Sequence, residues 1–408
     1  MRIATSHAYD QTIAELQGRQ QNLSSTQLQL TTGKRVVKAS DDPTNAARAE
    51  RALARIARSD ANQRTIDASR NVMNLASSSL TNATDLLQSA RETLMAGGDS
   101  SYSAADRKSL AVKLKDIRDQ LLSVANTPDG SGGYIYGGQG SSSPPFIDTG
   151  NGVIFQGQTG EQLASTGDRL NLTLDGQRVW LSAKSGNGVF TSGPDSSANS
   201  GGAWITAGSV TNPSQLPYPS NGGTSHSYQV VFHTGSGGTT YDVLEDGSTT
   251  LSSGQTYNAG AAIDIPGYGM QVAVNGVPAE GDTFQIGEAH NDLNVFTALD
   301  SAIAALNSSA TDSTVAQAVN TGLTNVDSVL STMLGAQSVV GEQLNRMDGL
   351  ESRNQDGKLA AQTEKSNAED LDMVQALSDF KNQESGYQAA LQSYAMVQKL
   401  SLFNYISS

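Results

Sequence analysis

The feature that most constrains this chain is the separation of its sequence into two helical ends and a glycine-rich middle. Of the 41 glycines, 31 lie between Gly130 and Gly287, and no proline follows Pro278. The ends are rich in small and unbranched residues, which suits slender helices whose backbones pack closely. This layout predicts an α+β protein. Both termini would form one long antiparallel, coiled-coil-like helical rod, with a small β-domain inserted at its distal end.

The two terminal segments have heptad patterns that are too polar to form a stable helix pair without further partners. Two inner positions of the first pattern are glutamines, Gln20 and Gln27, and isolated helices of this length are marginal in water. We therefore expect these stripes to become ordered by packing between subunits. The residues expected at that interface are Tyr9, Ile13, Leu16, Leu23 and Leu30 near the N-terminus, and Leu377, Phe380, Tyr387, Leu391, Tyr394, Leu400 and Phe403 near the C-terminus.

Between the first stripe and the next helix lies a break that ends in Asp41-Asp42-Pro43. An aspartate followed by proline is a helix start, because the carboxylate accepts the first N–H groups and proline suits the first turn. The helix that begins there has no strong breaker until Gly97. Basic side chains within the break (Lys34, Arg35 and Lys38) are open to two interpretations, a solvated face or a contact surface.

Three further helical segments are expected outside the terminal ones, and we expect their apolar stripes to pack within the chain. Ser103 and Asp106 form a capping-box pattern that opens the helix after Gly97. Thr311-Asp312 opens the long helix near the C-terminus. The stripes are Ile66, Met73, Leu80, Leu87 and Leu94 in the first half, and Phe296, Leu299, Ile303 and Leu306, then Val319, Val326, Met333, Val340 and Met347, in the second.

The middle of the chain predicts short strands joined by turns. Tyr134–Tyr136 and Val153–Phe155 are expected to pair. Leu170–Leu174 and Val179–Leu181 are expected to form a hairpin around Asp175-Gly176. The remaining expected strands are Tyr228–Phe232, Tyr241–Leu244, Met270–Val274 and Thr283–Ile286.

These patterns divide the chain into three expected domains. Residues 1–42 and 366–408 would form a terminal helical assembly domain. Residues 43–184 and 290–365 would form a helical rod domain with a small sheet, and residues 185–289 an outer β-rich domain.

Composition excludes several function classes. The formal net charge of −14 argues against nucleic acid and anionic membranes as partners. There is no cysteine, so disulfides and thiolate metal sites are excluded. The N-terminus has no apolar core of a cleaved signal peptide, so we expect any export to use another route.

The sequence predicts no enzyme, no cofactor and no metal. The histidines (His7, His226, His233 and His290) are not at metal-ligand spacing with a second ligand type. Nucleophile-elbow, phosphate-loop and dinucleotide-binding patterns are missing from the sequence, and Asp242–Gly247 lacks a calcium ligand at the third loop position. Asp168 and Asp175 bracket an expected strand and its turn, so a catalytic carboxylate pair is not expected.

The two ends resemble the flagellin superfamily, and within it the hook–filament junction proteins. The N-terminal match is LTTGKRVVKASDDPTNAA, from Leu30 to Ala47, and the C-terminal match runs from Leu391 to Ile406 and closes on LSLFNYI. Gly133–Gly138 and Gly281–Phe284 also match, at the expected junctions between helices and strands. About 300 residues at the two ends share the resemblance, and the middle is similar only in architecture.

The resemblance implies a secreted structural protein of the bacterial flagellum that joins the hook to the filament. Its partners would be the first hook-associated protein, flagellin, an export chaperone, and its own copies in a ring of about eleven subunits. Export would use the flagellar type III channel. Two alternatives remain: flagellin itself, or a secreted adhesin or carbohydrate-binding protein that acts through residues 185–289.

Overall fold

The computed structural model describes residues 2–99, 101–164, 169–195, 199–219, 225–308 and 311–406, with the side chains of 2–9 and 397–406 left out. Contacts between residues divide the chain into two compact units: residues 1–64 with 349–408, and residues 65–348. The helices are α1 (Arg2–Thr32), α2 (Pro43–Gly97), α3 (Ala104–Ala125), α4 (Gly176–Trp180), α5 (Val295–Asn307), α6 (Asp312–Glu369) and α7 (Met373–Ile406).

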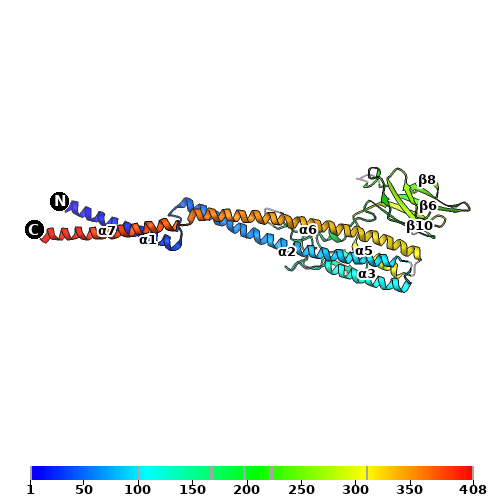
Figure 1. The fold of residues 1–408 in the computed structure, drawn as a ribbon, viewed down its shortest axis with the longest axis horizontal. Coiled ribbons are helices and arrows are strands. Elements are labelled where there is room, and N and C mark those ends of the chain that lie inside the picture. Colours follow the sequence, from blue (N-terminus) through cyan, green and yellow to red (C-terminus); the bar gives the residue numbers. More distant parts are fainter. Residues whose placement is uncertain are drawn as a thin grey trace. The chain divides into compact units, whose positions relative to one another are not determined.

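The first unit consists of two antiparallel helix pairs. Helices α1 and α7 lie side by side, and both chain ends lie at the same end of this pair (Figure 1). The start of α2 runs antiparallel to the end of α6, since Arg55 pairs with Glu364 and Asp60 with Lys358 further along. The predicted pairing of the two termini is therefore confirmed.

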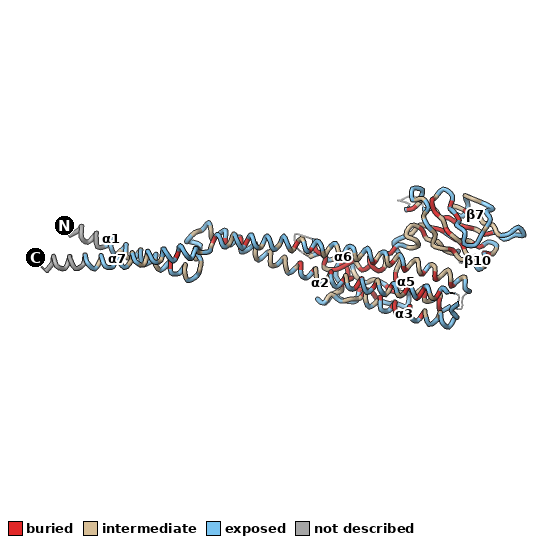
Figure 2. The backbone as a smooth tube through the Cα atoms, viewed as in Figure 1, coloured by how far each residue is buried: buried red, intermediate tan, exposed pale blue. Residues whose placement is uncertain are grey.

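Helices α2 and α6 extend into the second unit, where they pack against each other along a buried apolar stripe. The side chains of Met73, Leu80 and Leu87 on α2 and of Met333 on α6 are fully buried. Ion pairs border the stripe, with Arg91 Nε 2.7 Å from Asp327 Oδ1. The intramolecular packing predicted for these heptads is confirmed. In Figure 2 buried segments recur along α2 and α6, whereas α1 and α7 are almost entirely exposed or intermediate where they are described.

The capping box predicted for α3 is also confirmed. The Ser103 hydroxyl accepts the Asp106 N–H, and the Asp106 carboxylate accepts the Ser103 N–H. Helix α3 packs on α5, and the buried guanidinium of Arg118 on α3 bonds to Asp148 and Asp300. This cluster joins α3 to α5 and to a hairpin formed by β1 (Phe146–Thr149) and β2 (Gly152–Phe155).

Several strand predictions in this unit are wrong. Tyr134–Tyr136 lies mostly in a turn, and Leu170–Leu174 is not a strand, since it makes only an isolated bridge from Asn171 to Leu163. Val153–Phe155 pairs with β1 and not with Tyr134–Tyr136, because the latter segment bonds instead to the backbone of Thr127 and Leu174. Val179–Leu181 is not a strand, since Asp175 caps the short helix α4. The Trp180 ring stacks on Phe296 at 6.0 Å between centroids, so tertiary packing has overridden the local alternation.

The outer part of the second unit contains two antiparallel sheets with one shared core. The four strands predicted there are confirmed as β6, β7, β10 and β11. The five-stranded sheet has the order β3-β11-β6-β7-β8, and the other has β4-β10-β5 with β9 beside β10. The strands are β3 (Phe190–Pro194), β4 (Gly202–Ile205), β5 (Ser209–Val210), β6 (Tyr228–Gly235), β7 (Gly238–Glu245), β8 (Thr249–Thr256), β9 (Ala262–Ile265), β10 (Met270–Val277) and β11 (Thr283–Glu288).

The predicted α+β class is confirmed, since the chain combines long helices with a small antiparallel β-domain. Both sheets contribute to the β-domain core, which contains Phe190, Phe232 and Phe284. In the part of the chain that the structure describes, no helix is both long enough and apolar enough to cross a membrane.

Candidate assembly interface

The contact between α1 and α7 is small and polar. The Thr26 hydroxyl donates to Gln383 Oε1 at 2.9 Å and lies within 3.0 Å of the Asn22 carbonyl oxygen. Arg19 approaches the backbone of Gly386. Among the described side chains of these two helices, only Thr26 and Ala376 are buried. The pair is therefore held in register by hydrogen bonds and close approach, and it has almost no apolar core of its own.

Helix α7 turns small residues toward α1 and displays its large apolar residues on an adjoining face. Ala376 and Gln383 are seven residues apart and lie on the side that meets α1. Leu377 and Leu391 lie about 60–100° further round the helix, given 100° per residue, and both are exposed. Met373 occupies the same stripe and is also exposed. A second apolar surface on α7 is thus left without a partner inside the described part of the chain.

The residues proposed for the interface from sequence fall into three groups. One group is exposed, and another is half-buried along α1 and α7. The remaining side chains lie outside those that the structure describes, although their backbones are helical. The exposed ones are Leu377 and Leu391; the half-buried ones are Ile13, Leu16, Leu23, Leu30, Phe380, Tyr387 and Tyr394; those outside the described side chains are Tyr9, Leu400 and Phe403.

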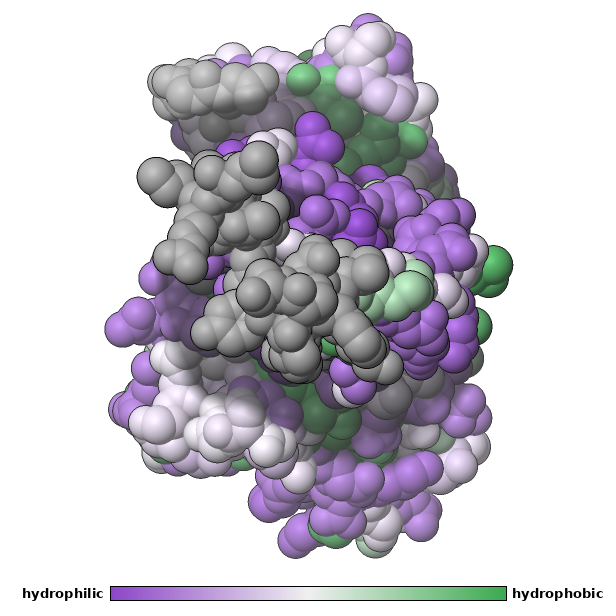
Figure 3. Space-filling view, turned by 90° about the vertical axis from the view of Figure 1, so that its left-hand side faces the viewer, coloured by the Kyte–Doolittle hydropathy of each residue, from purple (hydrophilic) through white to green (hydrophobic). Residues whose placement is uncertain are grey.

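Sequence reasoning missed three exposed apolar side chains of α7, those of Met373, Val374 and Met396. Met373 stood in the heptad pattern, so its spacing was a usable signal. Val374 and Met396 lie outside that pattern, and nothing in the sequence distinguishes them. On the face shown in Figure 3 hydrophilic residues predominate among the coloured atoms, and hydrophobic residues form separate small patches.

A compact junction links the ends of the helices in the first unit. The backbone N–H of Arg35 donates to the Glu369 carbonyl at 2.7 Å, and the Leu371 N–H donates to the Gly33 carbonyl at 3.0 Å. Gly33 adopts a φ of 70°, a conformation that favours glycine. The break after α1 and the break before α7 therefore form one paired structure.

Charged side chains tie this junction together. Glu369 is bonded by Lys365 Nζ at 2.8 Å and by Lys34 Nζ at 3.3 Å, and these hydrogen bonds, led by that of Lys365, lower the pKa of its carboxyl group. Arg35 donates to the Ala368 carbonyl at 2.9 Å and lies near Asp42. Two of the three basic side chains in the break are thus engaged with their own chain.

The aspartates of the break have separate roles. Asp42 Oδ1 accepts the Asn45 N–H at 3.0 Å at the first turn of α2, and this bond lowers the pKa of Asp42. Pro43 is the first residue of that helix. Asp41 Oδ2 instead accepts the N–H groups of Val37 and Lys38 and closes the preceding turn. Asp42 and Pro43 therefore fix where α2 begins, and Asp41 shapes the approach to it.

The cap of α7 was not anticipated. Asp372 Oδ1 accepts the N–H groups of Val374 and Gln375 at 3.0 and 3.1 Å. An aspartate directly before an apolar heptad is an ordinary start signal for a helix, so Leu371-Asp372-Met373 contained the information. This cap holds the first turn of α7 beside the junction.

The described residues contain no group of three or more His, Cys, Asp or Glu side chains arranged to hold a metal ion. Asp168, one of the two aspartates considered as a carboxylate pair, lies outside the described residues. The carboxylate of Asp175 is hydrogen-bonded within the chain, since it accepts the Gly160 N–H at 2.9 Å and caps α4.

Comparison with known proteins finds relatives of this chain among flagellar proteins. The model of the bacterial flagellin N-terminal helical region matches residues 3–141. Flagellar hook-associated protein 3 of Escherichia coli strain K12 is 25% identical over 416 residues, which cover 99% of each chain. The protein of the same name from Salmonella typhimurium has the same identity and coverage.

Solved structures give the same relationship. The flagellar hook-associated protein 3 of Legionella pneumophila aligns with a TM-score of 0.70 and 28% identity, over 77% of this chain and 97% of that one. FlgL of Xanthomonas campestris aligns with a TM-score of 0.67 and 28% identity, over 78% of this chain and 99% of that one. The chain is accordingly similar over nearly its whole length to flagellar hook-associated protein 3, and its N-terminal third matches the bacterial flagellin N-terminal helical region.

Proposed function

We propose that this protein is a structural adaptor of the bacterial flagellum, located outside the cell at the hook–filament junction. It joins the hook, through the first hook-associated protein, to the flagellin filament. The full-length similarity to flagellar hook-associated protein 3 supports this function over that of flagellin itself. A structural adaptor performs no reaction, and the expectation of no enzymatic activity belongs to this proposal.

The observation that carries the proposal is the apolar face of α7 that has no partner in the described part of the chain. Leu377 and Leu391 lie two heptads apart on an exposed stripe, with Glu384 at the position between them, and such apolar positions suit a helix that packs against further helices. The α1–α7 pair contains little else to stabilise it. Neighbouring subunits that cover this stripe would therefore complete the fold of the terminal helices as they assemble.

The detailed assembly follows from the same proposal. Subunits form a ring of about eleven copies through α1 and α7, and residues 1–42 with 366–408 act as the assembly domain. Residues 43–184 with 290–365 form the helical rod domain, and residues 185–289 the outer domain. An export chaperone covers the apolar face of α7 before assembly. The interface is formed by the stripe residues from Tyr9 to Leu30 and from Leu377 to Phe403.

Deletion of residues 391–408 tests the assembly role. We expect a soluble protein that cannot restore filaments in a strain lacking the gene, because the outer half of the α7 stripe is gone. A deletion within residues 185–289 is the matched control and should be tolerated much better. If the truncated chain still restored filament growth, the terminal helices would not be the assembly element.

Copy number separates this function from that of flagellin. A junction adaptor is present at roughly one ring per flagellum, whereas a filament subunit is present in thousands of copies. Quantitative mass spectrometry of isolated flagella measures the ratio. An adhesin acting through residues 185–289 predicts instead that this domain binds glycans when expressed alone, and an adaptor predicts no such binding.

A further inference from the structure

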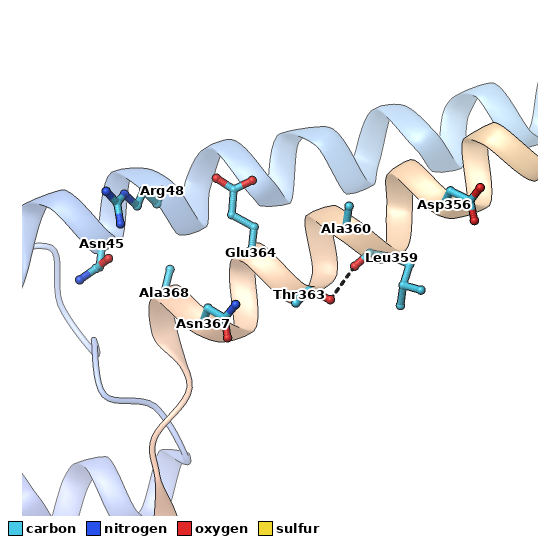
Figure 4. Close-up of a pocket in the computed structure, with 9 residues that line it drawn as sticks. All are labelled: Asn45, Arg48, Asp356, Leu359, Ala360, Thr363, Glu364, Asn367 and Ala368. Atoms are coloured by element: carbon cyan, nitrogen blue, oxygen red, sulfur yellow. Dashed lines mark hydrogen bonds between the residues drawn. The ribbon is translucent and has the colours of Figure 1, made fainter.

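A groove of about 680 Å³ runs along one side of the α2–α6 pair within the first unit. Figure 4 shows its lining: α2 contributes one amide and one arginine, and α6 contributes small and polar side chains together with two carboxylates, those of Asp356 and Glu364. The Leu359 side chain at its edge is 64% exposed. The lining residues are Asn45 and Arg48 from α2, and Asp356, Leu359, Ala360, Thr363, Glu364, Asn367 and Ala368 from α6.

A row of arginines borders this groove on α2. Arg48, Arg51, Arg55 and Arg58 are spaced by three, four and three residues, which places them on one face of the helix. This face adjoins the groove, because Arg48 lines it and Arg55 NH1 reaches Glu364 at 2.7 Å. The other three are exposed, and no carboxylate in the described part of the chain pairs with them.

The opposite side of α2 carries an exposed acidic residue and an exposed apolar residue. Leu53 follows Arg51 by two residues, which turns it about 200° away at 100° per residue. Its side chain is 46% exposed. Glu50, three residues before Leu53, shares that side, is exposed, and has no cationic partner among the described residues. The α2–α6 pair therefore carries a groove bordered by exposed arginines on one side and an acidic, apolar ridge, Glu50 and Leu53, on the other.

We propose that the groove receives the Glu50–Leu53 ridge of a second copy of this chain. The inference rests on the proposed ring assembly and identifies a lateral contact within it. Arg51 of one copy meets Glu50 of the next, and Leu53 packs beside Leu359. The arginine row excludes a two-fold contact, because it would then face itself. Unlike surfaces on opposite sides of one helix pair give a head-to-tail contact, which is the type that closes into rings.

Cysteine cross-linking tests the contact directly, because the chain has no cysteine of its own. The variant Leu53→Cys/Thr363→Cys puts one thiol on the ridge and one in the groove. Within one chain Leu53 lies on the side of α2 turned away from the groove that Thr363 lines on α6. We therefore expect no disulfide within one chain, since a disulfide needs Cα atoms within about 7 Å. Mild oxidation of isolated flagella should therefore give a ladder of cross-linked multimers of this chain.

The two single-cysteine variants are the controls. Each should remain monomeric after oxidation, since a head-to-tail contact never brings two copies of the same site together. Dimers of Leu53→Cys alone or Thr363→Cys alone would contradict the proposal. A double variant that restores filaments and yet stays monomeric would also contradict it, as would a cross-link to a different flagellar protein.

A charge swap tests the chemistry of the contact. Arg51→Glu places two acids across each contact, and Glu50→Arg places two bases there. Each single change should lower the fraction of cells with filaments at least about tenfold, as expected where like charges meet. The double variant Arg51→Glu/Glu50→Arg restores opposite charges and should restore filaments to within about twofold of the original chain.

Arg64→Glu is the matched control for Arg51→Glu, since Arg64 is an exposed arginine on the same helix but on the other side. It should leave filament formation unchanged. Equal loss in both variants, or no rescue by the swap, would overturn the groove contact. If the original chain itself failed to restore filaments, the proposed adaptor function would fail instead, so the two failures are distinguishable.

Discussion

Replacing both exposed leucines of α7 should separate assembly from monomer stability. The change is Leu377→Gln/Leu391→Gln. Glutamine has nearly the same helix propensity as leucine, so the helix itself is little affected. In the free chain these side chains are 54% and 42% exposed, and together they expose about as much surface as one leucine. The other half of each side chain is covered within the α1–α7 pair, but the few contacts of that pair do not order it in the free chain. The unfolding free energy of the monomer should therefore fall by no more than about 0.5 kcal/mol.

Assembly should respond much more strongly. Complete burial of one leucine side chain contributes about 1.5–3 kcal/mol, and neighbouring subunits would cover the equivalent of one such side chain per copy. Each 1.4 kcal/mol corresponds to a factor of ten in an equilibrium constant. The association of each subunit should therefore weaken by roughly 10- to 150-fold.

Two measurements separate the effect of the variant on monomer stability from its effect on assembly. Urea unfolding of the purified monomer, followed by circular dichroism, gives the stability. Electron microscopy of cells that carry the variant gives the fraction with filaments. We expect an unchanged urea midpoint and few filaments. A monomer destabilised by more than about 1 kcal/mol would show that the leucines pack within the chain. Unaffected filaments would show that no neighbour covers them.

Three further outcomes follow from the second unit. Leu80→Ala removes a fully buried side chain and should cost about 2–5 kcal/mol in urea unfolding. Arg118→Met removes the hydrogen bonds that lower the pKa of Asp148. The original chain should therefore lose stability as pH falls below about 4 and through that lowered pKa, and the variant should lose less over the same range. The hydrogen bond to Glu280, with Asp242 nearby, raises the pKa of His233. This contribution is complete below about pH 6.5 and is lost as pH rises through the raised pKa, so His233→Gln should flatten the decline in stability as pH rises above about 6.5.

The helices could be predicted because their packing repeats along the sequence. Met73, Leu80 and Leu87 recur every seven residues, and a stripe of that length specifies both the helix and its buried side. The strands were harder. Strand β6 alternates buried and half-buried residues, whereas β8 is exposed along most of its length and offers no alternation. Its pairing with β7 is what makes it a strand.

Helix α4 shows why short elements escape such reasoning. Five residues contain too little sequence to display a period, so Val179-Trp180-Leu181 matched a strand equally well. The deciding facts are tertiary: the stacking of Trp180 on Phe296 and the bond from the Arg178 N–H to Asp175. The apolar face of α7 was visible in its heptads. The sequence could not predict that this face points away from α1, because that depends on which residues of α7 contact α1.

The α1–α7 pair is much less buried than the α2–α6 pair, and this difference suggests that the terminal helices need contacts from other subunits to become ordered. A hydrogen bond such as that between Thr26 and Gln383 contributes about 0.5–1.5 kcal/mol net, whereas ordering a backbone costs about 1–2 kcal/mol per residue. Helix α1 contains 31 residues, so its few contacts with α7 cannot offset that cost alone. The stripe of α2 and α6 is already buried within one chain. We infer that stable folding before assembly belongs to the second unit, and that neighbouring copies supply the energy that orders α1 and α7.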